Sequence, residues 1–353
     1  MNAATGSLAA SLAASTAFPF QYDAATEQVL MVPLSVDAVN RAAFLDQRVL
    51  ASAGGSAAVT IHDFEAAAES LPARSSALIF HQGHCGSTLL SRLLATSTAS
   101  RAYREPLALR TLAALAANVA AGDSTVSPAV AARRLTLFLR CLAQGSTPAV
   151  VKASSICGDL AQIALAEDQG ARALFLFLRP EVYIATMLAG PNNRVDLAAF
   201  GGLRRQRLRN RGVETEPLYA LSPGRLAALA WLCEAIAFSS VPNDPRLIAV
   251  DFDAFLSDPV SALQSAARHL GLSIEATAAR AAVEGPDMRT YSKAQQHEYS
   301  PALRAEVLRQ ARQDHAGEIK AGLDWLAAAA ARSELAQRAI LRLSYPSGGV
   351  RSA

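Results

Sequence analysis

The 353-residue chain is long enough to bury a sizeable core, and its 51% hydrophobic and 18% charged residues exclude wholesale disorder. A net charge of only +3 gives no indication of a nucleic-acid partner. The four cysteines are widely spaced and form no CxxC pair, which disfavours a zinc site and a disulfide framework and fits a reducing cytoplasm.

The N-terminal region divides into two parts. Residues 1–20 are rich in Ala and Ser and lack a basic segment ahead of their apolar part, so we expect a disordered leader and not a signal peptide. Residues 21–72 mix a β-like piece, QVLMVPL, with a helical piece, VDAVNRAAFLDQRVLA, and we expect an extension packed on the main domain. Charges interrupt every later apolar stretch well before the roughly 20 residues of a membrane span, so the sequence predicts no membrane partner.

Short apolar runs alternate with amphipathic segments in the main domain, residues 73–343, and residues 344–353 have the composition of a flexible tail. The predicted strands are 77–83, 149–154, 172–179 and 246–252, with a weaker one at 101–105. Continuous apolar strands separated by helices indicate a parallel sheet that is covered on both faces. The sequence therefore predicts an α/β fold, in which ligands bind beyond the carboxyl ends of the strands.

The segment FHQGHCGSTLL, residues 80–90, joins the first predicted strand to a helix. Gly83 and Gly86 allow backbone conformations that direct successive N–H groups at one anion, and the helix that starts near Ser87 adds further N–H groups. The hydroxyl groups of Ser87 and Thr88 can donate to the same oxygens. The lysine of nucleotide-kinase loops, GxxxxGK[ST], is missing, which disfavours a phosphotransferase. The alternative is an ordinary strand-to-helix turn with a serine N-cap.

From this loop onward the chain resembles the sulfotransferase family. Many bacterial members carry a strand, a loop of the form G-x-x-R-S-G-T-T-L-L and a helix, and GHCGSTLLSRLL is similar to this pattern with His84 in the place of Arg or Lys. Further segments are similar to the family in the same order, namely YREPLALR, VVKAS, LFLFLRPEVYIATML and VDFDAFLSDPVSALQSAARHLGL. The resemblance implies a three-layer P-loop fold with a central parallel sheet flanked by helices.

The resemblance also implies the chemistry. The donor would be PAPS (3′-phosphoadenosine 5′-phosphosulfate), which leaves as PAP (3′-phosphoadenosine 5′-phosphate) after its sulfuryl group passes to a hydroxyl or amine of a small-molecule or glycan acceptor, without a metal. Lys152 would place a cation at the bridging oxygen, and Glu105 would take the proton of the acceptor. The implied donor-binding residues are Gly83, His84, Cys85, Gly86, Ser87 and Thr88 of the loop, Arg179 and Thr186 for the 3′-phosphate, and Arg289 and Lys293 closing over the nucleotide.

Two features leave alternatives open. His84 would be a weaker substitute for the basic residue, would act as acid or base itself, or would mark changed donor chemistry. The stretch GGLRRQRLRNRG, residues 201–212, favours a solvated helix face over the wall of an entrance for an anionic acceptor. The alternatives to a sulfotransferase are a phosphotransferase on the same scaffold and a catalytically inactive nucleotide-binding homologue.

Overall fold

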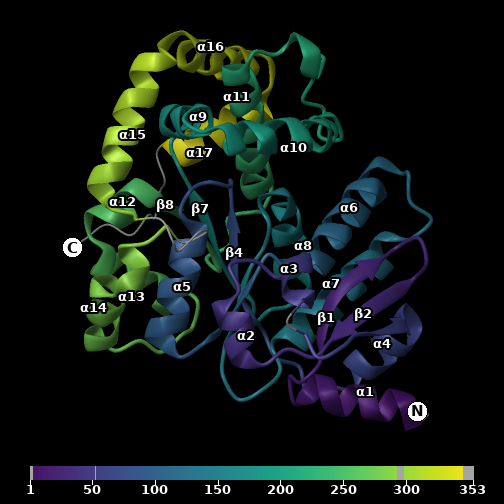
Figure 1. Ribbon diagram of the computed structural model, residues 1–353. Coiled ribbons are helices and arrows are strands. Elements are labelled where there is room, and N and C mark those ends of the chain that lie inside the picture. Colours follow the sequence, from purple (N-terminus) through teal and green to yellow (C-terminus); the bar gives the residue numbers. More distant parts are fainter. Residues whose placement is uncertain (1–2, 52, 292–297, 345–353) are drawn as a thin grey trace.

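A five-stranded parallel sheet lies at the centre of the computed structural model, which describes residues 3–51, 53–291 and 298–344 (Figure 1). Its strands are β4 (Ala77–His81), β5 (Arg101–Arg104), β6 (Ala149–Lys152), β7 (Arg172–Phe177) and β8 (Leu247–Asp251). They lie in the order β5-β6-β4-β7-β8, and every neighbouring pair is parallel. The five predicted strands are confirmed, and their carboxyl ends share one edge of the sheet.

Helices cover both faces of this sheet. One layer, on the left in Figure 1, consists of α5 (Ser87–Thr98), α13 (Pro259–His269) and α14 (Ala276–Glu284). The layer on the other face includes α6 (Leu107–Ala121), α7 (Pro128–Leu142) and α8 (Leu160–Glu167). All residues of β4 are buried between the layers, which explains why this strand is apolar along its whole length. The predicted three-layer α/β class is therefore confirmed.

A second helical group gathers at the top of Figure 1 around α11 (Pro223–Ser239). Its neighbours are α9 (Pro180–Leu188), α10 (Pro191–Arg209), α16 (Ala316–Arg332) and α17 (Glu334–Ser344). Trp231 of α11 donates from Nε1 to the carbonyl of Leu178 at 2.8 Å, and Phe238 stacks on Phe175 of β7 with the ring centroids 4.8 Å apart. Because α11 is enclosed on all sides, it is apolar almost all round.

Shorter elements connect these layers. They are η1 (Ser155–Cys157) after β6, η2 (Leu218–Ala220) before α11, α12 (Phe252–Ser257) after β8, η3 (Pro286–Met288) after α14, and α15 (Pro301–Asp314) before α16. Two of them begin directly after strands, so η1 and α12 lie at the edge of the sheet where the carboxyl ends meet.

The N-terminal region forms an antiparallel sheet in the order β1-β2-β3 at the lower right of Figure 1. Its elements are α1 (Ala3–Ala13), β1 (Phe18–Asp23), β2 (Gln28–Val32), α2 (Val36–Arg41), α3 (Gln47–Leu50), β3 (Ala57–Thr60) and α4 (Ile61–Glu69). The expected disordered leader is wrong for residues 3–13, which form α1 and pack on α4. Ala-rich sequence has high helix propensity, and the burial of Leu12 supplies the tertiary contact that stabilises a short helix.

Edge strand β5 is covered by the segment between α2 and α3. Arg104 is fully buried and donates hydrogen bonds to the carbonyls of Val39, Asn40 and Ala42, the last at 2.8 Å. The N–H of Leu45 donates to the carbonyl of Arg104 at 2.8 Å. Burial lowers the pKa of Arg104 to about 10, so its guanidinium remains charged at neutral pH. These contacts satisfy the open edge and hold the segment beside the carboxyl ends of the strands.

Some sequence-based predictions lie outside the described residues. They concern Lys293 and residues 345–353 of the expected tail. Within the described residues, no helix has both the length and the apolar character needed to cross a membrane.

Candidate functional site

The loop between β4 and α5 turns through left-handed backbone conformations. Gly83, His84 and Gly86 have φ angles of +87°, +51° and +77°. Gly86, and not a serine, is the N-cap of α5, and no side chain caps the helix, so its first N–H groups are open to a ligand. A Cβ atom on Gly86 would lie 2.1 Å from the ring of Phe252, so only glycine fits this position. Cys85 is buried, and its Sγ contacts the carbonyl of Leu176 at 3.3 Å.

A cavity of about 270 Å³, which we call the α5 cavity, is lined by part of the loop and by the start of α5. The loop and α5 contribute His84, Gly86, Ser87, Thr88 and Leu89 to its lining. Residues from α9, α10, α12, α15 and the segments around Thr290 and Tyr299 complete the described walls. The predicted loop residues other than Gly83 and Cys85 therefore meet at this cavity.

Three polar atoms in the lining of the α5 cavity are buried without a hydrogen-bond partner among the described residues. They are Oγ1 of Thr88, Oη of Tyr299 and Nη2 of Arg304. Nη1 of Arg304 pairs with Asp253 at 2.7 Å, and its guanidinium lies 5.5 Å from the centroid of the Phe252 ring, which fixes its position. Each unsatisfied buried group costs about 1–3 kcal/mol, so a ligand with acceptor oxygens would stabilise this wall.

Tyr299 and Arg304 were missed by the sequence reasoning. Both lie more than 200 residues after the loop, in the segment YSPALR, residues 299–304. Nothing in this segment distinguishes them from the polar residues of an ordinary helix start.

The residues implied for the 3′-phosphate are separated. Thr186 lines the α5 cavity, and its hydroxyl donates to the carbonyl of Val182 at 2.7 Å. The side chain of Arg179 is 63% exposed, pairs with Asp251 at 3.0 Å and is not part of the cavity lining. Arg289 is exposed and donates to the carbonyl of Glu284 at 3.0 Å.

A second cavity, of about 220 Å³, is lined by Gly83 and His84 of the same loop, and we call it the Glu105 cavity. Its lining comprises Phe44, Asp46, Arg48, His81, Gly83, His84, Glu105, Arg110, Ser154, Ser155, Ile156, Asp196 and Phe200. The N-terminal region thus contributes one wall, and α10 contributes another.

Glu105 is held by three polar groups at the carboxyl end of β5. Its Oε1 lies 2.5 Å from Nζ of Lys152, and its Oε2 accepts from Arg110 at 2.8 Å and from Ser154 at 3.1 Å. Burial alone would raise the pKa of Glu105, but the positive charges of Lys152 and Arg110 and the hydrogen bond from Lys152 bring that pKa well below its usual range. Glu105 is therefore a carboxylate whose two oxygens both accept hydrogen bonds, and Lys152 forms an ion pair with it.

We expect the Glu105–Lys152 pair to couple by about 1–3 kcal/mol at pH 7 in a double-mutant cycle of Glu105→Gln and Lys152→Met, measured by urea unfolding. The pKa of folded Glu105 lies below its ordinary 4.5, so the coupling should be constant from pH 8 to pH 5 and decline only below 4.5. A coupling of zero at pH 7, or one that grows on acidification, would contradict this arrangement.

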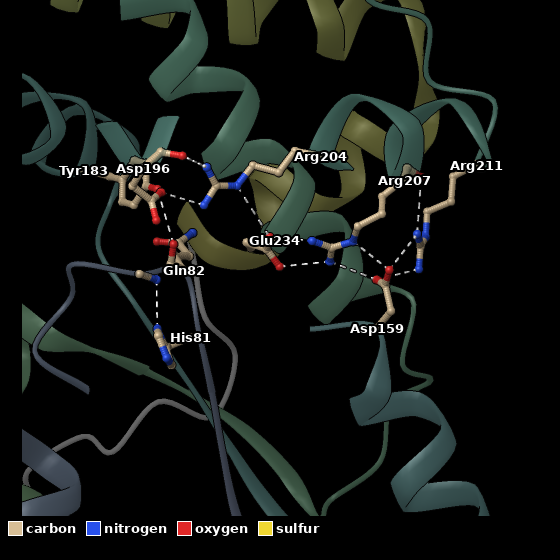
Figure 2. Close-up of polar contacts among 10 residues, drawn as sticks. His81, Gln82, Asp159, Tyr183, Asp196, Arg204, Arg207, Arg211 and Glu234 are labelled. Carbon is tan, nitrogen blue, oxygen red and sulfur yellow. Dashed lines mark hydrogen bonds and ion pairs between the residues drawn. The ribbon is translucent and has the colours of Figure 1, made fainter. Parts of the chain in front are cut away.

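The arginine-rich stretch 201–212 is not the solvated face that its charge run favours. Arg204 and Arg207 of α10 are 1% and 2% exposed, and Figure 2 shows them in a chain of ion pairs. Arg207 pairs with Glu234 of α11 at 2.6 Å and with Asp159 at 2.7 Å. Arg204 pairs with Asp196 at 2.9 Å.

The reason for this burial is the side-chain spacing on α10. Positions 204 and 207 lie on one face of α10, Arg211 follows just after the helix ends, and α11 brings the fully buried Glu234 against that face. Buried charges require partners of opposite sign, and three carboxylates balance the three arginines. The cluster therefore joins α10 to α11 and does not point into the Glu105 cavity as a free cationic surface.

Comparisons with known proteins give matches among solved structures alone. No family model matches the sequence, and no curated protein matches it. The sulfotransferase domain from the curacin biosynthetic pathway is 15% identical with a TM-score of 0.42, and the alignment covers 77% of this chain and 98% of that domain.

Two further solved structures give similar values. The sulfotransferase from Alicyclobacillus acidocaldarius is 16% identical, with coverage of 71% and 96% and a TM-score of 0.31. The sulfotransferase domain of the Synechococcus PCC 7002 olefin synthase is 15% identical, with coverage of 69% and 97% and a TM-score of 0.34. All three of these solved structures are sulfotransferases or sulfotransferase domains.

Proposed function

We propose that the chain is a sulfotransferase-like enzyme that binds PAPS in the α5 cavity and transfers its sulfuryl group to a hydroxyl or amine of a small-molecule or glycan acceptor in the Glu105 cavity. The observation that carries this proposal is the α5 cavity itself, where an uncapped helix start and three polar atoms without a hydrogen-bond partner among the described residues line one space. The wide spacing and burial of the four cysteines support a reducing, cytoplasmic setting.

The residues of the α5 cavity fit an anionic donor. The N–H groups at the start of α5 and the hydroxyl of Thr88 would donate to phosphate and sulfate oxygens. Arg304 would supply the cation that the loop lacks, because Nη2 of its guanidinium has no hydrogen-bond partner among the described residues. Thr186, Tyr299 and the apolar wall would enclose the nucleoside.

The transfer is an in-line displacement. The oxygen or nitrogen of the acceptor attacks sulfur, the bond from sulfur to the bridging phosphate oxygen breaks, and PAP leaves with that electron pair. Hydrogen bonds to the leaving phosphate stabilise the charge that develops on it, and the two cavities, which share His84 in their linings, would hold the donor and the acceptor next to each other.

PAP is expected to raise the melting temperature of the wild-type protein, because a ligand that binds only the folded state stabilises it. Thr88→Val should weaken PAP binding about tenfold, because it removes a hydrogen bond from a neutral hydroxyl. Arg304→Met should weaken it about 10- to 100-fold, because it removes a hydrogen bond from a charged guanidinium. The matched controls are Thr98→Val, on the same helix as Thr88, and Arg309→Met, on the same helix as Arg304. Binding is measured by calorimetry and melting by differential scanning fluorimetry.

The outcomes separate the alternatives. Absence of any PAP effect would overturn the proposal, and turnover of ATP with Mg²⁺ in place of PAPS would indicate a phosphotransferase. Binding of PAP without transfer to any of a panel of phenols, alcohols and amines would indicate an inactive nucleotide-binding homologue.

A further inference from the structure

Arg304 lies near the start of α15 and is held from two sides. Its Nη1 pairs with the carboxylate of Asp253 at 2.7 Å, and its guanidinium carbon lies 5.5 Å from the ring centroid of Phe252. The same ring lies against the loop, because a Cβ atom added to Gly86 would lie 2.1 Å from it. These contacts bring the guanidinium to the N-terminal end of α5, in the lining of the α5 cavity.

Asp253 reaches Arg304 from outside this cavity. It lies in the first turn of α12, and its N–H donates to the carboxylate of Asp251, the last residue of β8, at 3.0 Å. Its backbone is therefore tied to the edge of the sheet where the carboxyl ends meet. Asp253 does not line the α5 cavity, and among the described residues it is the one acid that forms an ion pair with Arg304.

The pair leaves one nitrogen of the guanidinium for a ligand. Nη1 faces Asp253, whereas Nη2 is buried without a hydrogen-bond partner among the described residues, as is Oη of Tyr299 in the same lining. Tyr299 lies close enough to sense both charges, because its pKa is raised by burial, lowered by Arg304 and raised by Asp253. Nη2 can therefore donate to an oxygen in the cavity while Nη1 keeps its pair.

The carboxylate of Asp253 has two opposing effects on an anion in the α5 cavity. Its negative charge repels the anion, but its side chain is 37% exposed, so water and salt weaken this repulsion. Its pair with Arg304 favours binding, because fixing a flexible arginine only when the ligand arrives lowers affinity. The guanidinium is already held by Asp253 and by the ring of Phe252, so little ordering remains for the ligand to impose.

We propose that Asp253 is a positioning residue for the donor, which holds Arg304 so that Nη2 is available to a phosphate oxygen. This inference rests on the proposed function and assigns a role to a residue that does not itself touch the donor. The positioning effect exceeds the repulsion, so this carboxylate strengthens the binding of an anion.

The first test measures PAP affinity by calorimetry. Asp253→Ala should weaken PAP binding about 3- to 10-fold, the effect of one flexible side chain that the ligand must order. Asp253→Asn, which keeps the size and removes the charge, should weaken it in the same direction. The matched control is Asp324→Ala, which removes the acid of the exposed pair with Lys320 on α16 and should leave PAP affinity unchanged. Unchanged or tighter PAP binding in either Asp253 variant would overturn the proposal.

The second test asks whether Asp253 acts through Arg304, and it uses a double-mutant cycle on PAP affinity. Once Arg304→Met has removed the guanidinium, Asp253→Ala should cause no further loss, because no cation remains to be positioned. An equal loss in the wild type and in the Arg304→Met background would indicate a general effect on the fold and would overturn the positioning role. Melting temperatures without PAP, measured by differential scanning fluorimetry, show that each variant is folded.

The results distinguish this inference from the proposed function. A wild-type protein that does not bind PAP would overturn both. PAP binding that Arg304→Met weakens and Asp253→Ala does not would overturn the role of Asp253 and leave the donor site as proposed. PAP binding that neither change weakens would overturn the roles of both side chains while leaving a protein that binds the donor product.

Discussion

Glu234→Gln is expected to destabilise the protein by about 3–5 kcal/mol, the usual cost of removing one partner from a buried ion pair. Glu234 is fully buried on α11 and accepts from Arg207 at 2.6 and 3.0 Å. Glutamine keeps the shape but not the charge, so Arg207 would remain buried with Asp159 as its sole carboxylate contact and Arg204 would keep only Asp196. The free energy of unfolding, measured with urea, reports this loss.

The matched control is Glu306→Gln, which removes a carboxylate of an exposed pair with Arg309 on α15. Exposed ion pairs contribute little because water and salt screen them, so this variant should unfold like the wild type. Equal unfolding curves for Glu234→Gln and the wild type would contradict a buried network that joins α10 to α11.

Gly86→Ala is expected to abolish PAP binding and sulfuryl transfer and to lower the stability of the fold by about 3 kcal/mol. The added Cβ would lie 2.1 Å from the ring of Phe252, and overpacking of this kind costs about 1–3 kcal/mol. A left-handed φ of +77° adds about 1–2 kcal/mol for any residue with a Cβ. Because Phe252 and the start of α5 both line the α5 cavity, the displaced ring would also change the donor site.

Gly122→Ala separates the two contributions. Gly122 has a φ of +79°, but a Cβ there would meet no atom within 4 Å, so this variant reports the backbone strain alone. We expect Gly122→Ala to be less destabilising than Gly86→Ala and to leave PAP binding unchanged. Similar losses of stability and equal PAP affinity in the two variants would contradict the close contact between the loop and Phe252.

Local patterns were sufficient to predict the central architecture. The runs around Leu78, Val150 and Phe175 are apolar without alternation because a parallel strand is buried on both faces. This pattern can be recognised in a short stretch of consecutive residues. The turn of the loop could also be predicted from its glycines, since Gly83 and Gly86 lie where the backbone takes positive φ angles.

The arginine cluster shows where local patterns fail. A run of arginines has the same sequence whether water or carboxylates surround it, and the deciding partner, Glu234, lies on another helix. The prediction of a disordered leader was wrong for a related reason. Contact with α4 stabilises α1, and the sequence of residues 3–13 alone does not specify that contact.

The sequence by itself determined the parallel sheet, the turn geometry of the loop and the residue types at the strand ends, because these depend on burial periodicity and backbone conformation within short segments. Tertiary structure alone decided that Tyr299 and Arg304 line the same cavity as Thr88, that Glu105 pairs with Lys152 and Arg110, and that His84 lines both cavities. These outcomes depend on which distant side chains meet and pair, and the free energy of a buried charge or hydrogen bond is set by that partner and not by its neighbours in the chain.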